Sequence, residues 1–296
     1  MPRIAYFGPQ GTFTEQAAMR FEGELVPVET IPLAFAALRD GSTDFACVPI
    51  ENSVEGAVPA TLDALVRDEP VVAVAETVLD VRFSVLVRPG TPEIRTIASH
   101  PHALAQVREW IAATLPGVTS IATSSTASAA AAVERGEFDA AVSAPVAVNH
   151  YKLDEYATDI LDVPDARTRF LLLQRPGQLP EPTGADRTSV VVTTPDRVGV
   201  LSELLTELAL RGINLTGLES RPQKGKLGTY RFYIDVEGHI AEPRIGDALA
   251  ALHRHSREIR FLGSFPKADQ GPVEAHNAEF AAAASWVDAV RKGERG

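Results

Sequence analysis

Apolar and polar positions alternate along the first part of the chain in a way that predicts many short elements. Runs with the length of apolar strands are found at residues 4–7, 25–28, 45–50, 71–81, 83–87, 96–99, 120–122, 140–142 and 169–173. Segments with helical spacing lie between them, at residues 13–21, 31–40, 59–68, 101–114, 126–135 and 144–151. Strands that alternate with helices predict parallel sheets covered by helices. The apolar stretch 71–87 is placed to connect two lobes, so we predict a two-lobed α/β fold with a ligand cleft.

The pattern stops at residues 174–186, where Pro and Gly cluster without apolar periodicity, as in a linker. It then restarts as strand 188–194, helix 198–211, strand 214–221, a turn at 225–228, strand 229–236, helix 243–253 and strand 259–265. This βαββαβ order predicts a ferredoxin-like sheet of four strands with two helices on one face. We therefore expect domains at 1–178 and 186–266, then a tail, 267–296. The tail's short helix carries an apolar stripe of Phe280, Trp286, Val287 and Val290.

Composition and charge narrow the class of protein. A chain of 296 residues with 45% hydrophobic and 23% charged residues has enough apolar material for two or three folding units. The net charge of -11 argues against a nucleic-acid or anionic-membrane partner. Cys47 is the only cysteine, which excludes an internal disulfide, and its apolar neighbours predict a buried strand residue rather than a catalytic thiolate. Neither a signal sequence nor a membrane span is evident, so we expect a cytoplasmic protein.

Several turns place hydroxyls and backbone N–H groups at helix entries, where carboxylates bind well. In residues 8–15, two glycines precede Thr12, which serves either a ligand or a capping box with Glu15. Ser99 ends a strand before Pro101 and a helix. The flanking His100 and His102 are candidates for hydrogen bonding in a pocket. Because residues two apart on a helix face different directions and no partner has ligand spacing, we do not expect a metal.

Three more segments complete the candidate pocket. Ser125, Thr126 and Ala127 open an alanine-rich segment that either lets a ligand sit close or is only a serine-capped helix. Glu51, Asn52 and Ser53 follow an apolar strand, at the edge of an α/β sheet where ligands bind. Thr168 and Arg169 set a hydroxyl and a fixed cation at the mouth of the strand that continues through Phe170. A cation this close to a core normally meets an anion.

These segments, in their order along the chain, resemble the motifs of prephenate dehydratases. The matching motifs are Gly-Pro-x-Gly-Thr-Phe-Thr at 8–14, Pro-Ile-Glu-Asn-Ser-x-Glu-Gly at 49–56, Ser-His-Pro-x-Ala-Leu at 99–104, Ser-Thr-Ala-x-Ala-Ala at 125–130 and Thr-Arg-Phe at 168–170. The resemblance spans about residues 3–265, and the βαββαβ unit resembles an ACT regulatory domain. The chain departs from the family at Asp165, where Asn is frequent, at Ser128, where an acid is frequent, and at Val198, where Pro is usual.

The resemblance implies decarboxylative dehydration of prephenate to phenylpyruvate, without a metal or an organic cofactor, in a periplasmic-binding-protein-like catalytic domain. It assigns Thr168 the hydrogen bond to the leaving hydroxyl. Either Thr168 only orients that group, or it relays a proton, from water or from Glu51 if burial keeps that carboxylate protonated. Arg169 either pairs with a substrate carboxylate or supports the loop. The residues expected to bind the rest of the substrate are Thr12, Asn52, Ser53, Ser99, Ser125, Thr126, Ala127 and Phe170.

The ACT resemblance implies control by L-phenylalanine at an interface between copies of the chain, since an exposed sheet edge invites pairing. The implied effector residues are Gly199, Val200, Leu201, Asn214, Leu215, Glu219 and Ser220. A homodimer or homotetramer is expected. Two other functions fit the same sequence: arogenate dehydratase, whose substrate differs by an amino group, and a non-catalytic two-lobed sensor of small anions.

Overall fold

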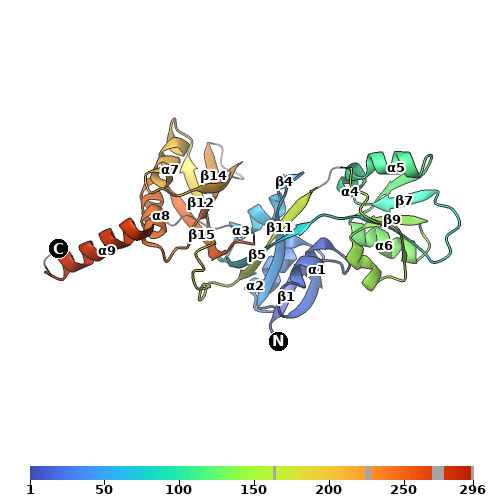
Figure 1. The fold of residues 1–296 in the computed structure, drawn as a ribbon, viewed down its shortest axis with the longest axis horizontal. Coiled ribbons are helices and arrows are strands. Elements are labelled where there is room, and N and C mark those ends of the chain that lie inside the picture. Colours follow the sequence, from blue (N-terminus) through green and yellow to red (C-terminus); the bar gives the residue numbers. More distant parts are fainter. Residues whose placement is uncertain (163–164, 224–227, 269–276, 295–296) are drawn as a thin grey trace. The chain divides into compact units, whose positions relative to one another are not determined.

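The computed structural model describes residues 1–162, 165–223, 228–268 and 277–294 (Figure 1). The chain forms two compact units. The first contains Met1–Ala64 and Thr77–Leu172, and the second contains Leu65–Glu76 and Leu173–Gly296. The first unit has two lobes whose strands belong to different sheets, and the second is the βαββαβ unit.

The first lobe contains parallel strands. Its strands are β1 (Arg3–Phe7), β2 (Glu24–Val28), β3 (Phe45–Asn52), β4 (Gly56–Ala57), β5 (Val72–Asp80) and β11 (Arg167–Gln174), and its helices are α1 (Phe13–Ala18), α2 (Ile31–Arg39) and α3 (Pro59–Leu65). The sheet order is β5-β11-β3-β1-β2, with β4 paired to β3. Because β1 pairs in parallel with both β2 and β3, the carboxyl ends of these strands meet at one edge. Cys47 is buried in β3, as predicted.

The second lobe has a five-stranded sheet covered on both faces. Its elements are β6 (Ser84–Val87), β7 (Thr96–Ser99), α4 (Pro101–Gln106), α5 (Arg108–Thr114), β8 (Thr119–Ala122), α6 (Thr126–Glu134), β9 (Ala140–Ser143), the 3₁₀ helix η1 (Pro145–Asn149) and β10 (Asp154–Ala157). Successive strand residues point to opposite faces. Ile97 packs in the cluster that holds Ile111 of α5, whereas Ala98 packs in the cluster that holds Val133 of α6.

The chain passes from the first lobe to the second between β5 and β6, which lie in different sheets. This confirms the prediction that the stretch 71–87 connects two lobes. The expected helix 101–114 is broken at Val107 into α4 and α5. The break is explained by Asp162, whose carboxylate accepts the N–H groups of Glu109 and Trp110 at 2.8 and 2.9 Å and so caps a new helix start. The polar edge strand β10 was not predicted, because its residues lack apolar alternation.

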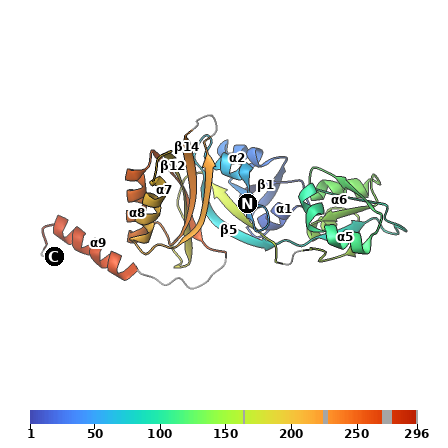
Figure 2. The ribbon, with the colours of Figure 1, turned by 90° about the horizontal axis from the view of Figure 1, so that it is seen from above.

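The second unit has an antiparallel sheet of order β13-β14-β12-β15. Its elements are β12 (Asp186–Pro195), α7 (Val200–Ala209), β13 (Leu215–Pro222), β14 (Thr229–Glu237), α8 (Pro243–His255), β15 (Glu258–Pro266) and α9 (Asn277–Arg291). Helices α7 and α8 cover the same face (Figure 2), and Val192, Leu204 and Leu252 meet in the core between them. The predicted βαββαβ order is confirmed. The predicted turn at 225–228 lies mostly outside the described residues.

Residues Leu65–Glu76 are built into the second unit, although they lie far from it in sequence. Ala73 of β5 pairs in parallel with Gly263 of β15. The Arg187 guanidinium lies 3.3 Å from Glu76, whose carboxylate is fully buried and accepts the N–H of Ala268 at 3.0 Å. A buried carboxylate requires such donors. The linker at 174–186 is therefore not the only place where the chain passes between the units.

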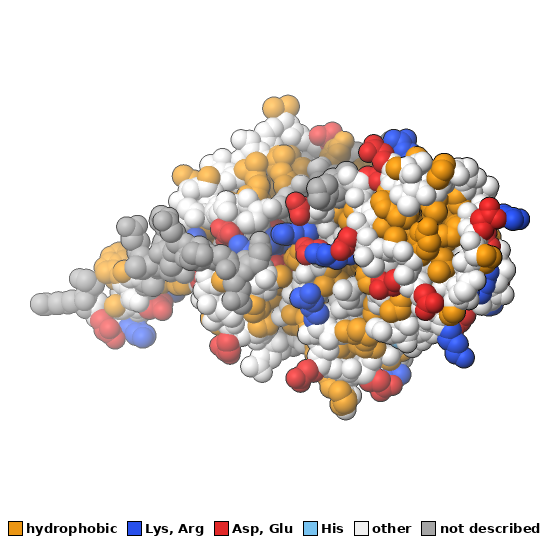
Figure 3. Space-filling view, turned by 45° about the vertical axis from the view of Figure 1, so that its right-hand side comes forward, with side chains coloured by type: hydrophobic (Ala, Val, Ile, Leu, Met, Phe, Trp, Pro, Cys, Tyr) orange, Lys and Arg blue, Asp and Glu red, His pale blue; other side chains and the backbone are white. Residues whose placement is uncertain are grey.

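The surface seen in Figure 3 carries acidic and basic side chains interspersed with one another. Among the helices that the structure describes, none is both long and apolar enough to cross a membrane. In the tail helix α9, Trp286, Val287 and Val290 are exposed.

Candidate active site

A cavity of about 570 Å³ lies within the first unit and is lined by residues of both lobes. From the first lobe and the connecting strand end come Phe7, Gly8, Thr12, Phe13, Thr14, Pro49, Asn52, Glu55, Gly56, Ala57, Val58, Pro59, Val81 and Thr168. From the second lobe come Phe83, His100, His102, Ala103, Gln106, Ser124, Ser125 and Thr126. The five candidate segments identified in the sequence therefore each contribute side chains to one cavity.

Thr168 and Asn52 form a fixed pair in this cavity. The Asn52 side-chain Nδ2 donates to Thr168 Oγ1 at 2.9 Å. The amide orientation is set by its other end, because Oδ1 accepts the N–H groups of Val54 and Glu55 at 2.8 and 3.1 Å. Since the Thr168 oxygen accepts a hydrogen bond from Asn52, its own O–H remains available to donate to a ligand. Thr168 is 9% exposed, which keeps that hydroxyl away from bulk water.

Glu51 and Arg169 do not line the cavity. Each directly adjoins a residue that does, and adjacent strand residues point to opposite faces. The Arg169 Nε atom lies 3.2 Å from Glu51 Oε2, with the two side chains 14% and 56% exposed. A proton relay from Glu51 required a buried carboxylate, and the exposure of Glu51 contradicts that condition. Of the two roles left open for Arg169, this geometry favours support of the loop over a contact with substrate.

The residues that cap the starts of helices α1 and α6 line the cavity. Thr12 caps α1 by accepting the N–H of Glu15 at 3.2 Å. The reciprocal half of the expected capping box is absent from this pair, because the Glu15 carboxylate accepts the N–H of Gly11 instead. Ser125 caps α6 in a complete capping box, in which Ser128 takes the place of the acid. The Ser128 departure from the family pattern thus leaves the helix start intact.

Four of the predicted binding residues lie outside the cavity lining. Ser53 joins β3 to β11, because its hydroxyl accepts the Arg167 N–H at 2.9 Å. Ser99 is fully buried and donates to the carbonyl of Val142 at 2.6 Å. Ala127 and Phe170 are buried in the core. Ser53 and Ser99 thus hold the strand ends that present the lining, and they do not line the cavity themselves.

The sequence analysis missed an aromatic wall and a polar lining group. Phe13 and Phe83 meet edge to face with centroids 5.4 Å apart, and they come from different lobes. An aromatic surface of this kind suits a planar ring. Gln106 lines the cavity, and its buried Oε1 has no hydrogen-bond partner among the described residues. The Phe13 position was visible in the first motif, whereas Gln106 had no signal beyond following the His-Pro turn.

His100 caps α4, since its Nδ1 accepts the N–H of His102 at 3.3 Å. Burial, and secondarily the nearby His102, lowers the pKa of His100, while Glu55 opposes this shift.

We expect the free energy of unfolding to fall as the pH drops below about 6.5. In this range the histidine of the unfolded chain binds a proton, whereas the lowered pKa keeps native His100 neutral. Comparing melting temperatures at about pH 7.5 and 5.5 tests this. The melting temperature of His100→Gln is expected to fall less between these two pH values than that of the wild type, and an equal fall in both proteins contradicts the prediction.

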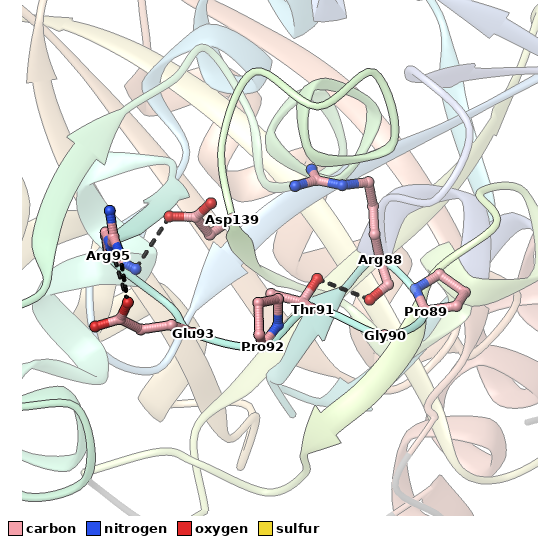
Figure 4. A pocket seen from close by; sticks show the side chains of 8 residues that line it. All are labelled: Arg88, Pro89, Gly90, Thr91, Pro92, Glu93, Arg95 and Asp139. Carbon is pink, nitrogen blue, oxygen red and sulfur yellow. Dashed lines mark hydrogen bonds and ion pairs between the residues drawn. The ribbon is translucent and has the colours of Figure 1, made fainter.

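A second cavity, of about 400 Å³, lies in the second lobe and includes Arg88 and Arg95 (Figure 4). Arg88 Nη1 donates to the carbonyls of Val133 and Phe138 at 2.5 and 2.7 Å, and Arg95 pairs with Glu93 at 2.7 Å. Because both guanidinium groups already have partners within the protein, we do not assign a substrate to this cavity. Within the described ranges, no group of three or more His, Cys, Asp and Glu side chains is placed to hold a metal ion.

Comparison with known proteins agrees with this geometry. Residues 4–178 match the family model of prephenate dehydratase, and residues 188–254 match that of the ACT domain. The prephenate dehydratase of Amycolatopsis methanolica is 62% identical over the whole of both chains. This chain belongs to the prephenate dehydratase family.

Solved structures of similar proteins include two that cover most of the chain. A prephenate dehydratase from Arthrobacter aurescens in complex with L-Phe is 44% identical with a TM-score of 0.90, and the match covers 98% of this chain and 99% of that one. A protein described as a novel type of quorum-quenching acylase is 30% identical with a TM-score of 0.82, covering 90% and 98% of the two chains. Two α/β lobes followed along the chain by an ACT domain are thus the architecture of this family member.

The effector positions implied by the ACT resemblance lie on one helix start and one edge strand. Gly199 precedes α7 with a positive φ of 83°, a conformation that favours glycine. Val200 is buried, and Leu201 and Leu215 pack against the core of the unit. Asn214 donates to Glu237 at 2.9 Å. Glu219 and Ser220 are exposed on β13, which ends the sheet.

Proposed function

We propose that this chain converts prephenate to phenylpyruvate in the biosynthesis of L-phenylalanine. The observation that carries the proposal is the Asn52–Thr168 pair, which directs one hydroxyl donor into a cavity walled by Phe13 and Phe83. The family membership of the chain supports the same reaction.

The reaction aromatises a ring by losing two substituents. The carbon–carbon bond to the ring carboxylate breaks and releases carbon dioxide, and its electron pair moves into the ring. The ring carbon–oxygen bond breaks in turn, and the hydroxyl takes up one proton and leaves as water. The Thr168 O–H is positioned to donate a hydrogen bond to that oxygen as negative charge develops on it. Since Glu51 is exposed and paired with Arg169, we assign Thr168 a donor and orienting role.

The substrate carries two carboxylates, which the negatively charged chain must hold with local donors. Thr12, Ser125 and Thr126 line the cavity at the starts of α1 and α6. Unsatisfied N–H groups at helix starts and neighbouring hydroxyls provide such donors. The apolar wall formed by Phe13, Val81 and Phe83 reduces the water around the ring, which strengthens these hydrogen bonds.

We further propose that the ACT domain, within 186–266, binds L-phenylalanine and alters the activity of the catalytic domain, 1–178. The Arthrobacter aurescens relative in complex with L-Phe supports this ligand. The effector residues are Gly199, Val200, Leu201, Asn214, Leu215, Glu219 and Ser220, with β13 pairing to a second copy in a homodimer or homotetramer. Residues 267–296 form a tail without assigned chemistry, and the enzyme works in the cytoplasm.

Steady-state assays of the purified protein with prephenate and with arogenate, each with and without L-phenylalanine, test this function. We expect turnover of prephenate to phenylpyruvate, followed by ultraviolet absorbance, and a change of rate on adding L-phenylalanine. Faster turnover of arogenate than of prephenate would reassign the substrate. Binding of prephenate without turnover of either compound would support the two-lobed sensor instead.

A further inference from the structure

A buried cluster links the two lobes of the first unit at a place the reaction scheme does not use. Its centre is the carboxylate of Glu15, a residue that is 3% exposed. Oε1 accepts the hydroxyl of Tyr6 at 3.2 Å, and Oε2 accepts the N–H of Gly11 at 2.6 Å. The third neighbour is His150, whose Nε2 lies 2.9 Å from Oε2. The first three residues belong to the first lobe, and His150 belongs to the second.

The Nε2 atom of His150 has no aligned hydrogen-bond acceptor among the described residues, so its short distance to Glu15 makes an ion pair when the imidazole carries a second proton. A carboxylate this deeply buried requires several donors or a cation to offset its loss of hydration. Burial, and secondarily the charge of Glu15, raises the pKa of Tyr6, so Tyr6 stays a donor. His150 is therefore the one neighbour in this cluster that can bring a positive charge to Glu15.

The turn that carries His150 makes a second contact with the loop of residues 10–15. Tyr151 follows His150, and its hydroxyl donates to the carbonyl of Gln10 at 3.0 Å. Gly11 lies between these contacts with a positive φ of 85°, and a Cβ there would lie 3.1 Å from the Tyr151 ring and 3.2 Å from Ala147. The second lobe thus holds residues 10–15 by packing, by the hydrogen bond from Tyr151 and by the close contact of His150 with Glu15.

The loop that Tyr151 and His150 contact also forms one wall of the substrate cavity. Gly8, Thr12, Phe13 and Thr14 line that cavity, and Gly11 lies among them in sequence. Neither Glu15 nor His150 lines it, so neither is expected to touch the substrate. Any effect of these two residues on turnover must therefore act through the position of this loop and the closure of the lobes around it.

We propose that His150 is a positioning residue for the dehydratase reaction, which holds the wall of residues 8–14 in place by pairing with Glu15 from the opposite lobe. The inference rests on the proposed function, because the affected wall is the one that binds prephenate. Without the pair, substrate binding must itself order the loop and bring the lobes together. This cost is expected mainly in KM, because the Asn52–Thr168 pair belongs to other strands.

The test compares His150→Leu, which removes both ring nitrogens, with His150→Gln, which keeps a hydrogen-bond donor. For His150→Leu we expect kcat/KM for prephenate to fall at least about tenfold, mostly through KM, with His150→Gln in between. His150→Ala is expected to regain part of its activity when imidazole is added. The matched control is His253→Ala, at an exposed histidine of α8, which should leave kcat and KM unchanged.

A readout without activity separates this inference from the proposed function. Hydrogen exchange followed by mass spectrometry should show faster exchange in a peptide covering residues 8–14 of His150→Leu, and unchanged exchange in His253→Ala. If the wild type fails to turn over prephenate while this exchange still rises, the proposed function is wrong and the positioning role stands. Kinetic constants and exchange of His150→Leu that equal those of the wild type would overturn the inference.

Discussion

Replacing Thr168 by alanine is expected to lower kcat for prephenate by about 10²- to 10⁴-fold, the range typical for a group that assists proton transfer. The cause is the loss of the one hydroxyl that Asn52 orients toward the cavity. KM should change much less, because the donors at Ser125 and Thr126 remain. The measurement is steady-state kinetics on protein whose circular dichroism and melting temperature match those of the wild type.

Two variants sharpen this test. Thr168→Ser keeps a hydroxyl and should retain much of the activity, whereas Asn52→Leu leaves Thr168 unoriented and should lose kcat in the same direction as Thr168→Ala. Thr119→Ala, at an exposed strand residue outside the cavity lining, is the matched control and should behave as wild type. A Thr168→Ala enzyme within about threefold of the wild-type kcat would remove this residue from the mechanism.

Replacing Gly263 by alanine is expected to destabilise the second unit by roughly 3 kcal/mol or more. A Cβ at this position would lie 2.2 Å from the carbonyl oxygen of Ala73, and the residue has a positive φ of 139°. The atoms in the way are backbone atoms of the paired strand β5, so relief requires the strands to separate. Chemical or thermal unfolding should show the loss as a lower midpoint.

Gly246→Ala is the matched control. Gly246 lies inside α8, and a Cβ there would meet only the carbonyl of Ile240, at the ordinary distance of 3.7 Å. Alanine in a helix interior is favoured over glycine, so this variant should be stabilised by about 0.5–1 kcal/mol. Equal midpoints for Gly263→Ala and the wild type would show that β5 and β15 do not make this close contact in solution.

The sequence was sufficient for the parts of the site that depend on strand ends. Asn52 and Thr168 each follow or begin an apolar run, and parallel strands bring such ends together. The same alternation explains the failure at Glu51, because a residue adjacent to a lining residue points the other way. A charge next to a core suggested burial, yet the strand placed Glu51 in solvent with Arg169 beside it.

Contacts between distant segments were beyond sequence reasoning. The helix break at Val107 depends on Asp162, which is more than fifty positions away along the chain. The residues around Val107 therefore do not predict the break. The Phe13–Phe83 contact and the pair of Glu15 with His150 likewise join the two lobes. Local periodicity identifies the elements, but only their packing decides which side chains meet.

The placement of Leu65–Glu76 limits how such enzymes can acquire or exchange a sensor by recombination. A crossover in the linker would separate Arg187 from its fully buried partner Glu76 and Gly263 from Ala73. The incoming ACT domain would then pack against a β5 strand from a different protein, whose residues were not selected to fit it. A functional recombinant must therefore receive residues 65–76 together with the ACT domain. The catalytic and regulatory domains are then inherited as a pair.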